Sequence, residues 1–508
     1  MNDAPVQVRH HGMLTGAIML ATFMQALDTT IAIVALPNMQ GSLQSSRDQI
    51  SWVLTSYIVA TAIATPLTAW LSNRMGRCRL YQASILGFTC ASVLCALSTN
   101  LWQMVGARLL QGLFGAALIP LSQAVMIDIN PKERVGRAMA FWGAGVMLGP
   151  ILGPLLGGWL TENVGWRWVF LINLPVGIVA WLAIARFLPE TRPQDQPLDV
   201  FGFITLSASV GLLQLMLDRG GELGWLESTE IRIAAIGCLI ATACFVIHTW
   251  TTSGVSFVNR ALLHDQNFVT GTAFAVLVGV MLFATMSLLP SLLQDLLGYP
   301  VLDAGWLMAP RGLGTMLSLV AAARLIEPLG QRTVLGLGFL LNAIAMGLLT
   351  QMTLDMDERL VLISSFVQGV GVGFVFIPVN AIAFGTLPPR LRNEATPIYN
   401  LLRTIGSSVG ISVVQTMLTD GTARAHAGLV AGIYRANPAL SGLPAPMDPG
   451  TVSGLALLNE WLTREAALIA YIGNFQFMAV LALLALPLLC LVRRPTVKAD
   501  SAAIEAAH

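Results

Sequence analysis

Charged side chains are scarce in this chain of 508 residues. Only 11% of its residues are Asp, Glu, Lys or Arg, 55% are hydrophobic, and the mean hydropathy is +0.71. Soluble globular domains carry about 25% charged residues. The composition therefore excludes a soluble protein and predicts an integral membrane protein with many spans. The formal net charge is +1 and no basic tract occurs, so nothing indicates binding to nucleic acid.

Residues and motifs of catalytic and metal sites are also few. The six cysteines lie in or beside apolar runs, which predicts no disulfide framework. The six histidines are scattered, and the sequence contains no G-x-x-x-x-G-K-[ST] phosphate loop, zinc ligand set or nucleophile elbow. We expect neither an enzyme nor an ATPase, and no cofactor. Any uphill transport would draw on an ion gradient, here taken to be the proton gradient.

Apolar runs long enough to cross a bilayer recur along the whole chain. Splitting them at charged residues, Gly and Pro predicts fourteen helical spans, most of them roughly 18–26 residues long. Their expected limits are 13–36, 50–71, 80–98, 101–125, 138–160, 166–187, 199–216, 231–250, 268–290, 304–323, 333–351, 359–384, 396–418 and 467–491. The first run is longer than the apolar core of a signal peptide and lacks a cleavage site, so we interpret it as a retained span.

The distribution of Lys and Arg predicts the orientation. With the N-terminus inside, 17 of the 28 basic residues fall on the inner side, 8 on the outer side and 3 within spans. This positive-inside bias places both termini in the cytoplasm and supports an even number of spans.

A weak internal repeat relates spans 1–6 to spans 9–14. QGLFGAALIP at 111–120 resembles QGVGVGFVFIP at 368–378, and Pro37 and Trp52 are spaced nearly as Pro290 and Trp306. Two parallel halves are a known transporter architecture. We expect a six-helix bundle at 1–190, two inserted spans at 191–262, and a second six-helix bundle at 263–508. The second bundle carries a long outer segment, 419–466, whose Pro/Gly part is expected to be irregular between amphipathic pieces.

One acid, Asp28, lies deep inside the first span. A carboxylate at that depth is costly, and it either fixes helix packing in a polar interior or gains and loses a proton along a transport path. We favour the second interpretation. Thr29 and Thr30 are placed to donate hydrogen bonds to it, and Gln25 shares its helix face, so Gln25 and Thr29 are expected to line a substrate cavity. Pro37 is expected to end the helix.

Arg108 lies at a similar depth in span 4. At about 1.5 Å per residue, Asp28 and Arg108 both sit roughly 10–12 Å below the outer ends of their helices. We expect them to interact, directly or through a polar chain. The alternative is that Arg108 extends to the outer interface. Gln111, three residues further along, is expected in the cavity.

Glycines line one face of span 5. Gly145, Gly149, Gly153 and Gly157 recur every four residues, which allows another helix to approach closely. Packing alone is the plain interpretation, and Pro150 is expected to add a bend.

Two further arginines lie within expected spans. In span 13, Arg403 is interpreted as a polar contact of a packing helix, near the inner gate. Arg311 in span 10 either lines the cavity or faces the outer interface.

The segment T-A-W-L-S-N-R-M-G-R-C-R-L after span 2 resembles the signature G-x-L-a-D-R-x-G-R-[RK] of the major facilitator superfamily. The matching residues are Leu71, Arg74, Gly76 and Arg77. The departures are Ala69, Asn73 and Cys78. R-L-L-Q-G from Arg108 resembles the family's R-x-x-Q-G. The span 5 pattern G-x-x-x-G-P-x-x-G resembles its antiporter signature, which marks exporters.

Taken together, the motifs resemble the fourteen-span drug:proton antiporters of the EmrB/QacA type, closest to the EmrB branch of Gram-negative inner membranes. The resemblance implies an all-α major facilitator fold of two six-helix bundles plus two extra helices. It also implies multidrug efflux by alternating access, with Asp28 and Arg108 coupling protons to small amphipathic substrates. It further implies a periplasmic membrane-fusion subunit and an outer-membrane channel as partners. The alternatives are a dedicated metabolite or siderophore exporter of the same fold, or a non-transporting membrane sensor.

Overall fold

The computed structural model is built from long helices, and the described residues contain no strand. It describes residues 10–130, 134–191, 193, 197–252, 257–354, 357–432 and 451–492. The side chains of a few residues inside these ranges, Pro150 among them, are not described. Within the described residues, twelve helices are long and apolar enough to span a membrane, and a bent pair makes a thirteenth. The 29-residue α8 occupies the place of the fifth expected span.

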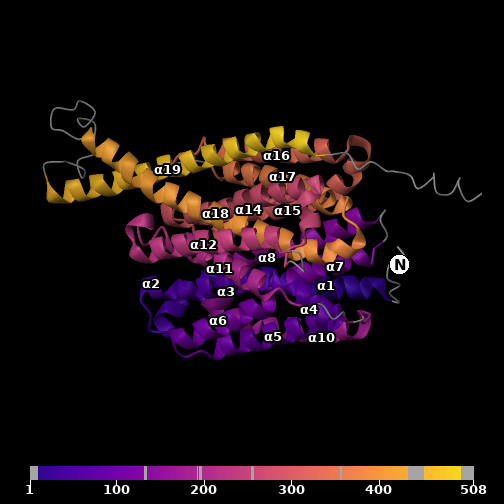
Figure 1. Cartoon of the computed structure of the whole chain (residues 1–508). Coiled ribbons are helices and arrows are strands. Elements are labelled where there is room, and N and C mark those ends of the chain that lie inside the picture. The colour runs from indigo at the N-terminus through magenta and orange to yellow at the C-terminus, as the bar shows by residue number, and fades with distance from the viewer. Residues whose placement is uncertain are drawn as a thin grey trace, which may run out of the picture.

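The N-terminal half contains six expected spans, several of them divided. Its elements are α1 (His11–Ser42), α2 (Arg47–Ile50), α3 (Trp52–Ala64), α4 (Leu67–Met75), α5 (Arg77–Leu97), α6 (Leu101–Gly115), α7 (Leu118–Asp128), α8 (Val135–Asn163), α9 (Trp168–Leu171) and α10 (Asn173–Phe187). Two long helices follow, α11 (Val200–Arg219) and α12 (Thr229–Thr251), with the short 3₁₀ turn η1 (Trp225–Glu227) between them. Figure 1 shows α11 and α12 lying between the two halves.

The C-terminal half repeats the six-span plan. Its elements are α13 (Arg260–His264), α14 (Gln266–Ser291), the π-helical turn η2 (Leu292–Leu296), α15 (Val301–Leu329), α16 (Gln331–Leu349), α17 (Glu358–Gly385), α18 (Pro389–Ala431), α19 (Val452–Leu488) and the 3₁₀ turn η5 (Leu489–Leu491). The division of the chain at 190/191 and 262/263 stays a prediction. Below, the inner and outer ends of helices are named by the predicted orientation.

The two halves pack in the same way, as the sequence repeat predicts. In the first half α1 packs on α8, α3 on α6, and α5 on α10. In the second half α14 packs on α18, α15 on α17, and α16 on α19. The two turns that follow the second span of each half also share one backbone conformation. Gly76 has φ 85° and ψ 147°, and Gly330 has φ 80° and ψ 155°. The halves are therefore structural copies of each other.

Two expectations about helix ends need correction. Pro37 does not end the first span, since α1 continues through it to Ser42. A proline inside a helix removes one hydrogen-bond donor, and neighbouring helices can support the resulting defect. Span 2 is not one helix but the pair α3 and α4, bent by 58° at Thr65–Pro66. Span 4 is likewise interrupted between α6 and α7, just before Pro120.

The outer segment 419–466 is more helical than its composition suggests. Helix α18 continues to Ala431 and α19 begins at Val452, so both extend well beyond the limits expected for spans 13 and 14. Figure 1 shows these extensions projecting past the rest of the bundle as a crossed pair, which we call the outer arm (419–432 and 451–466). His426 and Asn459 join them by a hydrogen bond of 3.0 Å. The Pro/Gly-rich part, 433–450, lies outside the described residues.

A capped turn fixes the inner ends of the two extra helices. Asp199 precedes α11 and accepts hydrogen bonds from the backbone amides of Gly202 and Phe257, both at 2.9 Å, and contacts His248 of α12. Burial acts to raise the pKa of the Asp199 carboxyl, but the two amides and His248 outweigh it, so the pKa lies below its ordinary value. Asp199 is therefore held as the charged cap that ties α11 to α12.

The paired turns give a matched test of backbone strain. A side chain on Gly76 would adopt a conformation that essentially only glycine uses, and its Cβ would lie 2.8 Å from the carbonyl oxygen of Thr191. Gly330 has the same conformation with nothing within 4 Å. We expect Gly330→Ala to cost about 1–3 kcal/mol from strain alone, and Gly76→Ala to cost more. Thermal unfolding of the purified variants measures both, and equal losses would contradict the role of the Thr191 contact.

Candidate functional site: a buried ion pair in the N-terminal half

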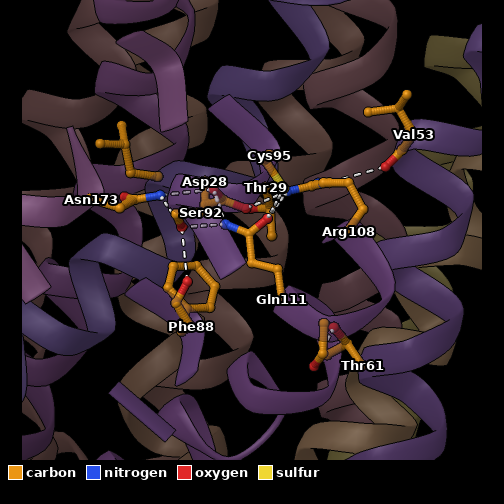
Figure 2. A network of polar contacts seen from close by, with 12 residues as sticks. Asp28, Thr29, Val53, Thr61, Phe88, Ser92, Cys95, Arg108, Gln111 and Asn173 are labelled. Carbon is orange, nitrogen blue, oxygen red and sulfur yellow. Dashed lines mark hydrogen bonds and ion pairs between the residues drawn. The ribbon is translucent and has the colours of Figure 1, made fainter. Parts of the chain in front are cut away.

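Asp28 forms a direct ion pair with Arg108. Oδ2 of Asp28 accepts a hydrogen bond of 2.7 Å from Nη1 of Arg108, and neither side chain is exposed. The other carboxylate oxygen, Oδ1, accepts hydrogen bonds from the side-chain amides of Gln111 at 2.8 Å and Asn173 at 2.9 Å. Figure 2 shows these groups converging on Asp28 from different helices. The expected interaction between Asp28 and Arg108 is direct, and Arg108 does not extend to the outer interface.

The guanidinium of Arg108 is held from several sides. Its Nε donates to the carbonyl oxygen of Val53 at 3.0 Å, and Nη1 also donates to Oε1 of Gln111 at 2.7 Å. The ring of Tyr57 lies against it, with its centroid 4.2 Å from Cζ. Both Val53 and Tyr57 belong to α3, which packs on α6. A cation over an aromatic face is favoured, and more so away from water.

A serine links the two amides that bind the acid. Ser92 of α5 accepts hydrogen bonds from Gln111 at 2.7 Å and Asn173 at 3.2 Å, and donates to the carbonyl oxygen of Phe88. The network therefore joins α1, α3, α5, α6 and α10. Every side-chain atom that contacts the carboxylate is a hydrogen-bond donor, so the arrangement fits ionised Asp28. Ser92 and Asn173 were not predicted, although both are polar residues inside apolar runs, and that signal could have found them.

Gly149, Gly153 and Gly157 place α8 directly against the part of α1 that carries Asp28. A Cβ on Gly149 would lie 2.5 Å from the carbonyl carbon of Ala26, and one on Gly153 would lie 2.1 Å from Oγ1 of Thr30. At Gly157 the nearest atom belongs to Ile31, at 3.0 Å. These three glycines, the predicted face of span 5, therefore abut residues 26–31. Gly145 sits further along, next to the flexible end of Met19 at 3.3 Å.

The polar neighbours of Asp28 on its own helix bind elsewhere. Thr29 donates to the carbonyl oxygen of Ala26 at 2.8 Å, and Thr30 donates to Leu27 and to Gly149 of α8. Neither threonine donates to Asp28, because a helical hydroxyl reaches the preceding turn of its own helix more easily. Gln25 is buried and accepts a hydrogen bond from the backbone amide of Ile119, where span 4 is interrupted. Roles for Gln25 and Thr29 in a cavity stay predictions.

The signature turn after span 2 contains an ion pair that the sequence did not predict. Arg77 begins α5 and pairs with Asp128, the last residue of α7. Its backbone amide also donates to Oγ1 of Thr191 at 2.8 Å. Arg74 lies over the ring of Trp70 at 5.9 Å. Asp128 thus supplies a negative charge at this turn, where Asn73 stands in place of the family's acid.

The C-terminal half repeats the network without its charges. Gln368 of α17 donates to Oγ1 of Thr285 at 2.9 Å, as Gln111 donates to Asp28. Thr285 in turn contacts the sulfurs of Met346 on α16 and Met478 on α19, the helices that correspond to α5 and α10. Three residues before Gln368 stands Ser365, in the place of Arg108. Within the described residues, this ion pair therefore has no counterpart in the second half.

Three amide side chains join the halves. Gln123 of α7 donates to Oδ1 of Asn380 on α17 at 2.7 Å, and its Oε1 accepts from Asn400 of α18 at 2.7 Å. All three are buried, and we call them the amide clamp. Beside it, Trp142 of α8 packs against Phe376 of α17, with ring centroids 6.0 Å apart. Gln123 lies near the inner end of span 4, so the halves are closed together on the inner side.

Comparison with known proteins gives the family. Residues 18–411 match the Major Facilitator Superfamily. The chain belongs to this superfamily. It is 34% identical to the multidrug export protein EmrB of Escherichia coli over 89% of each chain, and 34% identical to the fatty acid resistance protein FarB of Neisseria gonorrhoeae over 97% of this chain and 98% of that one.

A solved structure shows the same fold. The crystal structure of the human organic anion transporter MFSD10 (TETRAN) superposes with a TM-score of 0.60 over 95% of this chain and all of that one, at 16% identity. The membership in the superfamily and the likeness to EmrB-type exporters confirm the family predicted from the motifs. The chain is a multi-pass membrane transporter. Among the described residues, no cluster of His, Cys, Asp and Glu is placed to hold a metal ion.

The contact between α8 and α1 can be tested with two glycines of one face. Gly149→Ala puts a methyl group against rigid backbone, and overpacking of this kind costs on the order of 1–3 kcal/mol. Gly145→Ala is the matched control, because the flexible end of Met19 can move aside. Thermal unfolding in detergent should show a lower midpoint for the first variant and little change for the second. Equal unfolding midpoints for the two variants would contradict the close approach of α8 to α1 at Gly149.

The pairing of the two buried charges can be tested with a rescue. Arg108→Leu leaves the Asp28 carboxylate buried without its cation, and breaking a buried pair in this way costs about 3–5 kcal/mol. The double variant Asp28→Asn with Arg108→Leu removes both charges and should recover a large part of the loss. Thermal unfolding reports both values. A double variant no more stable than Arg108→Leu would show that the charge of Asp28 is not what Arg108 stabilises.

Proposed function

We propose that this protein exports small amphipathic or hydrophobic compounds across the inner membrane in exchange for protons, by alternating access between its two halves. The observation that carries the proposal is the fully buried Asp28, an acid held by a single cation within the membrane. Intramembrane ionisable groups mark ion and proton paths by default. The printed names of the relatives, multidrug export and fatty acid resistance, support export of such compounds.

Asp28 is the proton carrier in this cycle. When the cavity faces outward, Asp28 takes a proton from the outer side and the substrate leaves. Protonation removes the charge that Arg108 and the two amides bind, so the network of five helices loses its main attraction. Inward reopening then releases the proton to the cytoplasm and admits the next substrate. Arg108 is proposed to control how readily Asp28 takes up and releases its proton. A neighbouring cation favours the charged carboxylate, whereas burial favours the neutral acid.

The amide clamp closes the inner side in the outward-facing part of the cycle. Its hydrogen bonds are neutral, and each such bond contributes only about 0.5–1.5 kcal/mol to stability. A clamp of this strength can hold the halves together and still open when substrate and proton shift the equilibrium from the outward-facing to the inward-facing conformation. It also contains no titrating group, so the pH response of the cycle remains with Asp28. Arg403, on the same helix as Asn400, is proposed as a further polar contact of this gate.

The remaining motifs support the movement of the halves. The glycine face of α8, with Gly145, Gly149, Pro150, Gly153 and Gly157, lets α1 and α8 slide as one tightly packed pair. Arg74, Gly76 and Arg77 hold the inner turn after span 2, where Arg77 pairs with Asp128. The contacts of the described residues support these proposed roles. The side chain of Pro150 lies outside them.

The outer arm suggests where partners would bind. We propose an inner-membrane location with both termini in the cytoplasm, so that the arm projects into the periplasm. Val452, Leu455 and Trp461 are exposed on it. A periplasmic membrane-fusion subunit, followed by an outer-membrane channel, is the proposed assembly. A dedicated metabolite or siderophore exporter would differ in substrate breadth in a pump-deficient strain. A non-transporting sensor would show no gradient-driven flux in proteoliposomes.

The proton role is tested by Asp28→Asn in everted membrane vesicles. The amide keeps the size of the side chain and removes its ability to ionise, so we expect substrate-induced proton release to fall at least tenfold. Asp420→Asn on the outer arm is the matched control, because Asp420 is exposed and far along α18. It should keep the rate of the unmodified protein. Proton release at a normal rate by Asp28→Asn would refute the assignment.

A further inference from the structure

Arg311 is a buried cation without an acidic partner. It lies on α15, and only 4% of its surface is exposed. Nη2 donates a long hydrogen bond of 3.4 Å to the carbonyl oxygen of Leu282 on α14, and Nη1 has no hydrogen-bond partner although it is buried. An arginine does not lose its proton in a protein. The position therefore holds a permanent and poorly satisfied positive charge inside the membrane part of the molecule.

The internal repeat shows that Arg311 is not a second copy of Arg108. A Cβ on Gly112 would touch the backbone oxygen of Tyr57, and one on Gly369 would touch that of Arg311. Gly112 and Gly369 are equivalent glycines of the two Q-G motifs. Arg311 therefore stands where the first half has Tyr57, the ring that covers Arg108. The buried arginine of the C-terminal half therefore lies on α15, and not on α17, the helix that corresponds to α6 and α7.

In the described part of this half, no acid stands in the place of Asp28. Thr285 stands in the place of Asp28, as its bond to Gln368 shows. Ser365 stands in the place of Arg108, one turn before Gly369, and its hydroxyl is buried without a hydrogen-bond partner. No carboxylate of the described residues forms an ion pair with Arg311. Two unpaired donors, Nη1 of Arg311 and Oγ of Ser365, therefore lie on the packed helices α15 and α17.

The backbone of a second basic residue, Arg403, lies at the same level of α14. The backbone oxygen of Arg403 on α18 is 2.4 Å from the position that a Cβ on Gly279 would take. Gly279 is one helical turn from Leu282, which Arg311 contacts. No carboxylate of the described residues pairs with Arg403 either. Arg311 is therefore a buried positive charge without an ionic partner among the described residues, whereas the buried charges of the first half, Asp28 and Arg108, pair with each other.

We propose that Arg311, with the hydroxyl of Ser365, binds the anionic head group of an amphipathic organic acid as the transported substrate. Burying an unpaired cation is costly, and a carboxylate supplied by the substrate would relieve that cost with a charge-assisted hydrogen bond. Arg311 is sealed in the conformation described, so the helices around it must shift to admit the ligand, as alternating access requires. This inference deepens the proposed function and rests on it for transport, although not for binding.

The test uses three probes with one twelve-carbon chain and different heads: dodecanoate, dodecanol and dodecyltrimethylammonium. Binding to the full-length protein in nanodiscs is measured by quenching of tryptophan fluorescence. We expect preference for dodecanoate, with Arg311→Gln weakening its binding at least tenfold and leaving dodecanol unchanged. Arg311→Lys keeps the charge but not the planar fork, so it should restore part of the affinity. Ser365→Ala, which removes a hydroxyl that has no hydrogen-bond partner, should weaken the binding of dodecanoate alone by about threefold.

Arg424→Gln is the control for removing a positive charge, because Arg424 is exposed on the outer arm. It should bind all three probes as the unmodified protein does. Equal binding of dodecanoate by Arg311→Gln and the unmodified protein would overturn the site, as would equal binding of anion and cation by the unmodified protein. Flux of the probes in proteoliposomes is measured in parallel. Arg311-dependent binding without gradient-driven flux would support the site and overturn proton-coupled export.

Discussion

The interaction on which the structure of the N-terminal half depends is the burial of one negative charge against one positive charge. Asp28 and Arg108 are both inaccessible to solvent, so each is tolerable only because the other is 2.7 Å away. That requirement fixes the relative placement of α1 and α6. The amides of Gln111 and Asn173 then satisfy the second carboxylate oxygen, which adds α10 to the same arrangement. The hydrogen-bond network around one buried carboxylate thus connects five helices.

Close backbone approach makes this arrangement possible. Helix α8 touches α1 at Gly149 and Gly153, on the turns next to Asp28, and no larger residue fits there. The same device recurs between α3 and α6 at Gly112, and between α14 and α18 at Gly406 and Gly410. Tight glycine contacts transmit small shifts of one helix to the next, because a close-packed interface cannot deform gradually. A change of charge at Asp28 is therefore well placed to move the helices around it.

The two halves share a backbone plan but differ in electrostatics. The first half contains a buried ion pair, whereas the second has Thr285 and Ser365 in its place and holds Arg311 without an acidic partner among the described residues. The amide clamp then joins the halves through uncharged groups. Under the proposed function, this difference would give one half the site for the proton and the other half the site for the substrate. A symmetric protein with an acid in each half would have no such distinction.

The sequence by itself determined the class, the many apolar spans, the internal repeat, the burial depth of Asp28 and Arg108 and the glycine face of span 5. These follow from composition, from the length of apolar runs and from the cost of a charge in a bilayer, all of which are local properties. Only the tertiary structure decided which polar residues meet. Ser92, Asn173, Gln123, Asn380 and Asp128 are separated from their partners by up to hundreds of residues, and no local pattern specifies those pairs. The structure also decided that α1 passes through Pro37, because packing of neighbouring helices overrides local preference.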